Sequence, residues 1–319
     1  MGKAVRLVGD IGGTNARFAL VAGGSRQPQQ EQVVRCAEFD GLEQAIRRYL
    51  ADHGDPGIRE AALDVATGIT GDFVQLTNGP WGFSIEKTRQ ALALDRLHVI
   101  NDFTALALSV ATLQPHELRQ VGGGKPIAET AIAVIGPGTG LGVSGLLHAG
   151  ERWIALQGEG GHTAVSPTTE REIEVLRWLM QRFEHVSTER VVSGMGLVNL
   201  YRAICALDHT TAQALTPAQI TEVALAGKEV HCREALDMFC AILGAAAANL
   251  VVTLGAREGC YIGGGIVPRL GEYFARSPFR ARFEHKGRFS TYVAAVPTYV
   301  ILADTPALRG LATLFTDGR

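Results

Sequence analysis

The chain has 319 residues, 46% of them hydrophobic, and is long enough for one large or two ordinary globular domains. Its net charge of −2 gives no electrostatic footprint for DNA, RNA or an anionic membrane. The five scattered cysteines form no Cys-x-x-Cys pair, which argues against structural zinc and a disulfide framework and favours a reducing cytoplasm. No signal peptide is expected, and no apolar run approaches the roughly 18 residues of a membrane-spanning helix.

The first predicted element is a β-hairpin. An apolar strand over residues 5–8 leads to Asp10, and a second apolar strand follows over residues 18–22. Asp10 stands at the end of the first strand, where it could hold Mg²⁺ through water, because Mg²⁺ keeps much of its hydration shell.

The tip of this hairpin is built from Gly12, Gly13, Thr14 and Asn15. The glycines permit positive φ and leave backbone N–H groups bare, which suits phosphate oxygens, and the next two side chains add donors. A plain hairpin turn explains the same residues equally well. The pattern is neither a Walker A loop nor a dinucleotide-binding fingerprint.

The following segments alternate between strands and helices. Strands are predicted over residues 32–39, 61–66, 73–76 and 97–100, and helices over 42–53, 85–94 and 103–113. The first of these helices has apolar residues at helical spacing, at positions 42, 45, 46, 49 and 50. This order predicts an α/β unit with a mixed sheet.

A second unit is predicted to begin after the Gly/Pro-rich segment 114–130. Apolar strands over residues 131–135 and 141–147 flank a tip rich in glycine, and 153–156 forms a third strand. The strand, Gly/Thr-rich tip and strand of the first hairpin are thus repeated, which predicts a duplicated fold.

The rest of the chain is mostly helical. Helices are predicted over residues 170–184, 196–206, 217–227, 230–254 and 267–276, and strands over 260–262 and 299–302. Gly244 and the four alanines after it allow close packing of the long helix. A last helix is predicted with Asp304 as its N-cap and Pro306 in its first turn.

Seven motifs, in order and at compatible spacing, connect the chain to a family. They are GDIGGTNAR (9–17), ITGD (69–72), INDFTA (100–105), GTGLGV (138–143), GEGGH (158–162), ERVVSGMGLVNLYRAI (189–204) and IGGGIVPR (262–269). With them the chain closely resembles the bacterial ATP-dependent glucokinases, within the actin–hexokinase–Hsp70 superfamily, almost from end to end. It lacks the zinc-binding cysteine cluster of the repressor–kinase (ROK) group and resembles the zinc-free glucokinases.

The resemblance implies a two-lobed, actin-like (ribonuclease H-like) ATPase fold, with a duplicated mixed-sheet α/β unit and a central cleft. Residues 1–113 would form a small lobe, completed by a C-terminal helix over about 304–319, and residues 114–303 a large lobe. It further implies a cytoplasmic homodimer that binds glucose and ATP with Mg²⁺, without zinc, nucleic acid or membrane.

Sugar-binding roles also come from the resemblance. Asn101 and Asp102 end a predicted strand, where ligands bind in α/β proteins, although helix capping explains both residues too. In the family, the matching aspartate is the catalytic base and the asparagine binds the sugar. Residues that match Glu159, His162 and Glu189 accept hydrogen bonds from sugar hydroxyls; a structural histidine and a helix-dipole glutamate are the alternatives.

The nucleotide-binding residues that the resemblance implies are all in glycine-rich loops. They are Gly9, Asp10, Ile11, Gly12, Gly13, Thr14 and Asn15 in the first loop, Gly138, Thr139 and Gly140 in the second, and Gly264 and Gly265 near the adenosine. A strand-to-helix turn that requires glycine is the alternative for the last loop, and we prefer it for Gly263.

The predicted activity is transfer of the γ-phosphoryl group of ATP to the 6-hydroxyl of glucose. Two departures from the family pattern bear on it: Gly68 replaces a proline near the sugar, and residues 256–258 differ on the nucleotide side. The alternatives are a kinase for another hexose, a sugar-sensing regulator and a filament-forming actin relative. No helix-turn-helix, the DNA-binding element usual in such regulators, is expected before the first strand, and an actin relative has no reason to carry Asn101-Asp102 with GEGGH.

Overall fold

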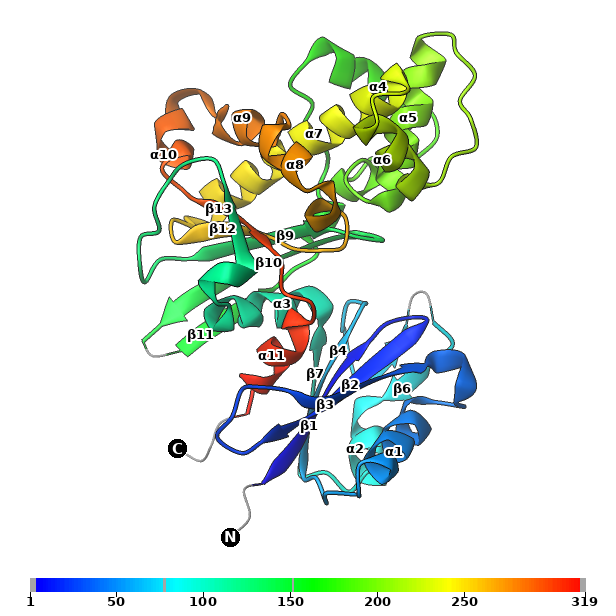
Figure 1. Ribbon diagram of the computed structural model, residues 1–319, viewed down its shortest axis with the longest axis vertical. Helices are drawn as coiled ribbons and strands as arrows, with labels where there is room; N and C mark the ends of the chain where they lie inside the picture. Colours follow the sequence, from blue (N-terminus) through cyan, green and yellow to red (C-terminus); the bar gives the residue numbers. More distant parts are fainter. Residues whose placement is uncertain (1–3, 77–78, 151, 316–319) are drawn as a thin grey trace. The chain divides into compact units, whose positions relative to one another are not determined.

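Two mixed β-sheets organise the chain in the computed structural model, which describes residues 4–76, 79–150 and 152–315 (Figure 1). Each sheet belongs to its own compact unit. Unit 1 contains the residues up to Gln114 and those from Ala303 onward, and unit 2 is Pro115–Leu302.

Unit 1 has a five-stranded sheet in the order β3-β2-β1-β4-β7. Its strands are β1 (Val5–Ile11), β2 (Asn15–Ala22), β3 (Gln29–Arg35), β4 (Glu60–Val65) and β7 (Arg96–Asn101), and β5 (Phe73–Gln75) and β6 (Gly82–Ser84) pair separately. β1 is antiparallel to β2 and parallel to β4, which is parallel to β7. The carboxyl ends of β1, β4 and β7 therefore share one edge of the sheet.

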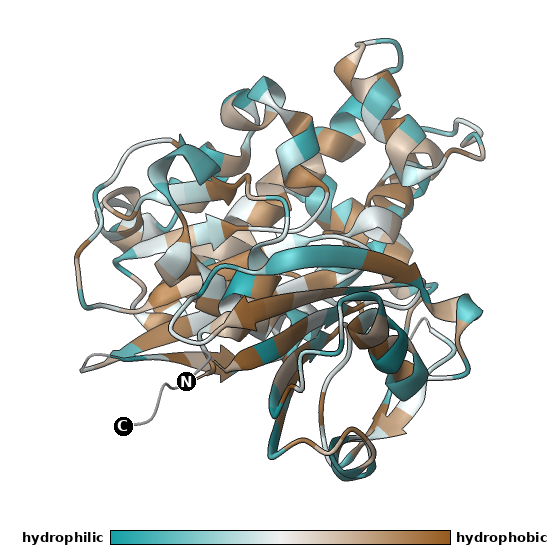
Figure 2. Ribbon diagram, turned by 60° about the horizontal axis from the view of Figure 1, so that its bottom comes forward, coloured by the Kyte–Doolittle hydropathy of each residue, from teal (hydrophilic) through white to brown (hydrophobic). Residues whose placement is uncertain are grey.

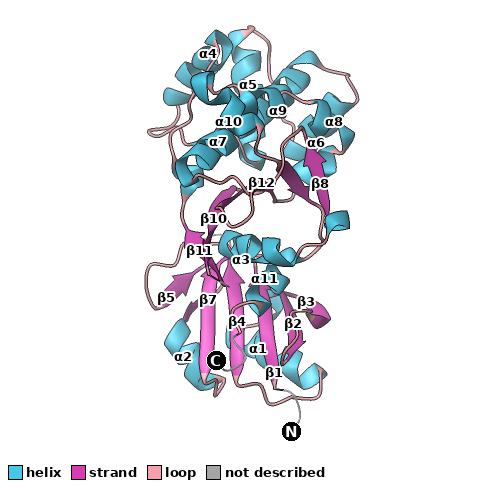
Figure 3. Cartoon of the chain, turned by 90° about the vertical axis from the view of Figure 1, so that its left-hand side faces the viewer, coloured by secondary structure: helices cyan, strands magenta, loops and turns pink. Residues whose placement is uncertain are grey.

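The helices of unit 1 are α1 (Leu42–Asp52), α2 (Ile85–Ala91), α3 (Asp102–Ser109) and α11 (Pro306–Ala312). The predicted apolar stripe of α1 is buried against one face of the sheet, in a core that includes Leu7, Phe18 and Leu63. α3 and α11 lie on the opposite face (Figure 3).

Unit 2 repeats this arrangement. Its sheet has the order β11-β10-β9-β12-β13-β8, with strands β8 (Leu118–Val121), β9 (Ile132–Pro137), β10 (Leu141–Ala149), β11 (Arg152–Gln157), β12 (Gly259–Ile262) and β13 (Thr298–Ile301). The first five positions have the same strand directions as the unit 1 sheet, and the antiparallel β8 is added at one edge. The predicted duplicated mixed-sheet α/β unit is confirmed.

The helices of unit 2 cover one face of its sheet (Figure 3). They are α4 (Glu170–Met180), α5 (Gly194–Leu207), α6 (Pro217–Leu225), α7 (Val230–Leu254), α8 (Glu272–Arg276), α9 (Phe279–Glu284) and α10 (Ser290–Ala294). Figure 2 shows long brown, hydrophobic stretches in several strands, whereas hydrophobic and polar residues alternate along the helices, as expected for amphipathic packing.

The long helix α7 corrects one expectation. By length and composition α7 could cross a membrane, so the prediction that no apolar segment is long enough for a membrane-spanning helix is wrong. However, 72% of its apolar stretch is buried, and its side chains form the centre of the unit 2 core. A Cβ on Gly244 would lie 2.2 Å from the carbonyl oxygen of Phe279, so glycine allows the predicted close approach, here to α9.

Three predictions about the ends of helices and strands were wrong, because neighbouring residues carry competing local signals. The N-cap of α11 is Thr305 rather than Asp304, although Pro306 does occupy the first turn. The helix predicted over 267–276 is split into a 3₁₀ turn (Val267–Leu270) and α8, because Gly271 adopts a φ of 55° between them. The strand predicted over 32–39 is instead β3, which ends at Arg35 before a 3₁₀ turn.

Gly310 of α11 packs closely against α3 in unit 1, and this contact can be tested. A Cβ on Gly310 would lie 1.9 Å from the carbonyl oxygen of Ala105 in α3, so Gly310→Ala must separate the two helices. We expect it to reduce the free energy of unfolding by about 2 kcal/mol, within the range for overpacked cores. Chemical denaturation measures this. The control Gly41→Ala has no atom within 4 Å of the added Cβ and should cost well below that; equal losses in both variants would contradict the close helix crossing.

Candidate functional site

In unit 1, the predicted phosphate loop follows β1 and the predicted base follows β7, two strands of one sheet that are separated by β4. Asp10 of β1 is in register with Asp64 of β4, and the next residue of β4, Val65, is in register with Asn101 of β7. Adjacent strands are about 4.8 Å apart. The Asp10 and Asn101 backbones are therefore about 10 Å apart along this edge, on the same sheet.

The loop between β1 and β2 is a tight turn with an exposed tip. The N–H group of Gly12 donates to the carbonyl of Asn15 at 3.0 Å, so it closes the turn and is not bare as predicted. Thr14 and Asn15 are exposed at the tip. Positive φ was also expected at Gly12 and Gly13, and neither glycine has it.

Close packing explains the glycine at position 9 and the glycine at position 79, which packs against the loop. The position of a Cβ on Gly79 is 2.8 Å from the Cα of Gly13, and a Cβ on Gly9 would meet Leu63 at 2.8 Å. Ile11 is fully buried in the core, so only its backbone could reach a ligand.

Asn101 and Asp102 differ in how they contribute to capping of α3, which was the alternative to a role in the sugar site for both residues. Asn101 is the N-cap of α3: its side-chain oxygen accepts from the N–H groups of Phe103 at 2.9 Å and Thr104 at 3.4 Å, and its amide donates to the Thr67 carbonyl at 3.4 Å. Asp102 is the first residue of the helix and accepts from the same Phe103 N–H through Oδ1 at 2.8 Å. The helix is therefore capped by Asn101, and Asp102 stands partly exposed at its start.

The carboxyl groups at this sheet edge perturb one another. Burial raises the pKa of Asp10 above its usual range, while a hydrogen bond with Asp64 and the charge of Arg17 lower it. Burial raises the pKa of Asp64 well above its usual range, and the neighbouring Asp10 and Asp102 raise it further.

No group of three or more His, Cys, Asp or Glu side chains is placed to hold a metal ion within residues 4–76, 79–150 and 152–315. Mg²⁺ in nucleotide sites usually keeps several waters and uses one or two carboxylates together with substrate phosphates. A single carboxylate such as Asp10, at a strand end beside the tip of the loop, fits that water-mediated role.

In unit 2, the loop Gly138–Gly140 is braced by Glu189. The N–H of Gly138 donates to the Gly140 carbonyl at 2.8 Å, and Glu189 Oε2 accepts from the N–H of Leu141 at 2.8 Å. A Cβ on Gly140 would lie 2.4 Å from that same oxygen, so a larger residue there would displace the Glu189 carboxylate. Glu189 therefore has a structural role in the loop, which adds to any role in sugar binding.

Glu159 and His162 are more accessible than Glu189, the third predicted sugar ligand of unit 2. Glu159 precedes the 3₁₀ turn Gly160–His162 and His162 is its last residue, and the N–H of His162 donates to the Glu159 carbonyl at 3.0 Å. Both side chains are exposed, and within the part of the chain that the structure describes neither makes a side-chain hydrogen bond or ion pair.

A cavity of about 640 Å³ lies beside the second loop of unit 2. Gly138, Thr139 and Gly265 line it, whereas Gly140 and Gly264 do not. Gly264 has a φ of 79°, and its Cβ would lie 2.4 Å from the Pro137 carbonyl oxygen, so it shapes the turn instead. The volume is within the range of about 300–1,000 Å³ for small-molecule pockets.

The sequence did not predict the remaining walls of this cavity. They come from the start of α5, from the whole length of α6 and from the segment after Gly265, and comprise Gly194, Met195, Leu197, Thr216, Pro217, Ala218, Thr221, Glu222, Leu225, Ile266 and Arg269. Met195 is 56% exposed and Leu225 41% exposed, which gives the cavity an uncovered apolar wall. The SGMG segment of the sequence was a usable signal, because it belongs to the motif 189–204, in which only Glu189 has a predicted role.

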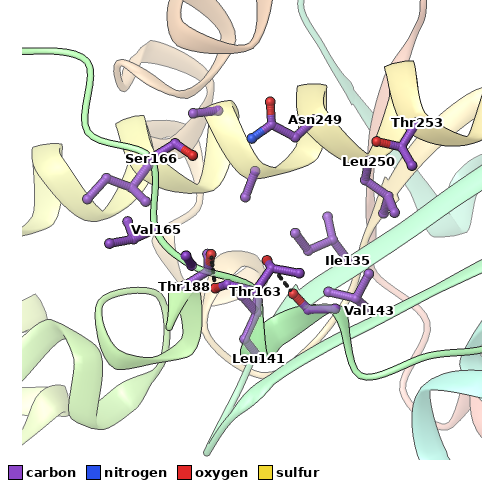
Figure 4. A pocket seen from close by; sticks show the side chains of 15 residues that line it. Ile135, Leu141, Val143, Thr163, Val165, Ser166, Thr188, Asn249, Leu250 and Thr253 are labelled. Atoms are coloured by element: carbon purple, nitrogen blue, oxygen red, sulfur yellow. Dashed lines mark hydrogen bonds between the residues drawn. The ribbon is translucent and has the colours of Figure 1, made fainter. Parts of the chain in front are cut away.

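A second cavity, of about 280 Å³, lies in unit 2 between α7 and the segment that follows the Gly160–His162 turn (Figure 4). Its wall is held by hydrogen bonds from Thr163 to the Gly160 carbonyl at 2.8 Å and from Thr188 to the Thr163 carbonyl at 3.1 Å. Glu159, His162 and Glu189 do not line this cavity, which is separate from the predicted sugar ligands.

Comparisons with known proteins identify the family. The family model described as Glucokinase matches residues 7–317. A glucokinase of Chromobacterium violaceum is 52% identical over 315 residues, covering 98% of this chain and 89% of the relative, and one of Neisseria meningitidis serogroup C is 50% identical over 307 residues, covering 96% and 93%. The crystal structure of a glucokinase from an Antarctic psychrotroph superposes with a TM-score of 0.89 at 36% identity, covering 97% of this chain and 98% of that one.

These matches extend over nearly the whole chain, and the two sheets have the topology of the actin-like ATPase fold of sugar kinases. The chain belongs to the glucokinase family and is an ATP-dependent phosphotransferase.

Proposed function

We propose that the protein transfers the γ-phosphoryl group of ATP to the 6-hydroxyl of glucose, giving glucose 6-phosphate and ADP, with Asp102 as general base. The Asp102 carboxylate accepts the proton of the 6-hydroxyl as the bond from O6 to phosphorus forms and the bond to the leaving ADP breaks. Because phosphoryl transfer passes through a loose transition state, orientation of the hydroxyl contributes more than the basicity of the carboxylate.

One structural observation carries the proposal. The tip Gly12–Asn15 and Asp102 belong to the same carboxyl edge of the unit 1 sheet, at the ends of β1 and β7. A general base at the same sheet edge as a phosphate-binding turn can accept the proton of the hydroxyl group that receives the phosphoryl group. Sequence identity of about half with glucokinases over nearly the whole chain supports glucose as the acceptor.

The cavity beside Gly138 and Thr139 supports the nucleotide part of the proposal. We place the adenine against the exposed apolar wall formed by Met195 and Leu225, and the phosphates toward Thr139. The positive end of the 14-residue helix α5, at Gly194, lines the same cavity and favours anionic groups.

The exposed side chains of Glu159 and His162 suit a hexose, which presents several hydroxyl donors and has no charge. A carboxylate and an imidazole provide acceptors for them. Mg²⁺ near Asp10 through water and a cytoplasmic location remain predictions from the residues, and the absence of zinc and a homodimer remain predictions from the family resemblance.

The position of phosphorylation provides the test. With Mg-ATP and glucose, we expect NMR of the product to show phosphate on O6, and 6-deoxyglucose to inhibit competitively without being phosphorylated. Phosphate at another oxygen, or faster turnover of another hexose in a panel at equal concentration, would contradict the proposed reaction.

A further inference from the structure

Residues 209–228, here called the α6 segment, connect α5 to α7 and form one wall of the 640 Å³ cavity. The chain turns sharply near both ends of this segment, because His209 has a φ of 53° and Gly227 a φ of 66°. Between the two turns, the segment contributes six residues to the cavity: Thr216, Pro217, Ala218, Thr221, Glu222 and Leu225. The position of the α6 segment therefore determines the shape of the cavity.

The helix in this segment depends on its surroundings for its position. α6 has nine residues, and isolated helices of that length are marginal in water because nucleation of the first turn is costly. It packs against α5 and α7 through the buried side chains of Ile220 and Ala224 (Figure 1). These contacts fix one face of α6, and the freedom that remains is limited by how firmly the ends of the segment are held together.

An imidazole ring connects the two ends of the α6 segment. Asp208, the C-cap of α5, comes directly before the segment, and Glu229, the N-cap of α7, comes directly after it. The ring of His231 contacts both: its Nε2 is 3.4 Å from Asp208 Oδ2, and its Nδ1 is 2.6 Å from Glu229 Oε1. The carboxylates on the two sides of the segment are thus linked through one side chain.

Arg171 of α4 joins the same ends from the other side. Its Nη2 is 2.8 Å from both carboxylate oxygens of Asp208, and its Nε is 2.8 Å from Glu234 Oε1 in the first turns of α7. The N–H groups of a guanidinium are held in a rigid plane, so these contacts fix the end of α5 relative to the start of α7. Without this cation, Asp208 and Glu234 would repel each other.

We propose that Arg171 is a positioning residue for the nucleotide, because together with Asp208 and His231 it closes the ends of the α6 segment and holds the cavity wall in place. Arg171 does not line the cavity, so it acts only through the α6 segment. The inference rests on the proposed function, which places ATP in this cavity, and adds the group that keeps the cavity in shape.

Arg171→Ala tests this role. We expect the KM for Mg-ATP to rise about fivefold, the scale of a strong ion pair that is partly exposed, while kcat and the KM for glucose stay within about twofold. Hydrogen–deuterium exchange without ligands should show faster exchange of amides in residues 209–228. Asp208→Asn removes the partner charge and should change the KM for Mg-ATP in the same direction. The double variant should exceed neither single variant by much, because both remove one interaction.

A second ion pair of α4 provides the matched control. Arg282 Nη1 is 2.8 Å from Glu172 Oε1, and the Glu172 side chain is only 4% exposed. Arg282→Ala leaves this buried carboxylate unpaired and should lower the melting temperature. Since neither residue contacts the ends of the α6 segment, the KM for Mg-ATP and the exchange in residues 209–228 should stay as in wild type.

An unchanged KM for Mg-ATP in Arg171→Ala would overturn the inference, even if the melting temperature falls. An equal rise of this KM in Arg282→Ala would also overturn it, because general loss of stability would then explain both variants. Asp208→Asn decides the question if Arg171→Ala does not fold. If the wild-type protein shows no glucose-dependent turnover, the proposed function fails instead, and the exchange in residues 209–228 still decides whether Arg171 holds the α6 segment.

Discussion

Replacing Asp102 by alanine is expected to lower kcat roughly 100-fold or more, the scale associated with loss of a general base. The KM values for glucose and Mg-ATP should change much less, because the proposed role is realised in the transition state. Steady-state kinetics with both substrates varied measures the two effects separately.

The capping arrangement makes this variant informative. Asp102 accepts from the Phe103 N–H, but Asn101 accepts from the same group and also caps Thr104, so α3 keeps its N-cap without Asp102. Its thermal unfolding should therefore be close to that of wild type. Asp95→Ala is a matched control, because Asp95 is an exposed acid of unit 1 that pairs with Arg59 and precedes β7, at the opposite end of that strand from Asp102. A variant without Asp102 that retains near-full turnover would exclude it as the base.

Replacing Glu159 by alanine should raise the KM for glucose by about 10- to 100-fold, since hydrogen bonds to charged groups contribute about 1.5–3 kcal/mol. The side chain is exposed and has no hydrogen bond within the described ranges, so the loss of affinity should come without loss of stability. Isothermal titration with glucose tests this directly.

Glu184→Ala, which removes another exposed glutamate of unit 2, is the control and should bind glucose as wild type does. Glu189 is a poor substitute in this experiment, because its Oε2 holds the N–H of Leu141 and its removal would disturb the Gly138–Gly140 loop. Unchanged glucose affinity in Glu159→Ala would remove this residue from the sugar site.

The long elements could be predicted from the sequence because their periodicity is sustained. The helix predicted over residues 230–254 is α7 (Val230–Leu254), and α5 and α6 begin within two residues of their predicted starts. The hairpin pattern and its repeat predicted the duplicated sheet, because a turn with apolar strands on both sides is a local signal. The short helices α9 and α10 and the strand β8 were missed, since a few residues carry no measurable period.

The candidate site was only partly predictable, for a physical reason. Gly138, Thr139 and Gly265, from the predicted nucleotide loops, line the 640 Å³ cavity, but Met195 and Leu225 come from helices whose apolar residues looked like core. Which apolar residue stays uncovered depends on tertiary packing. The same holds for Asp64, whose neighbours Asp10 and Asp102 are distant in sequence and meet it only through strand register.

Release of ADP from Mg-ATP in a coupled assay, with and without glucose, tests the central claim most directly. We expect ADP release that depends on glucose and saturates with it, together with little hydrolysis in its absence. An ATPase rate that is the same with and without glucose, or no turnover although both ligands bind, would contradict the assignment of this protein as a glucose-phosphorylating enzyme.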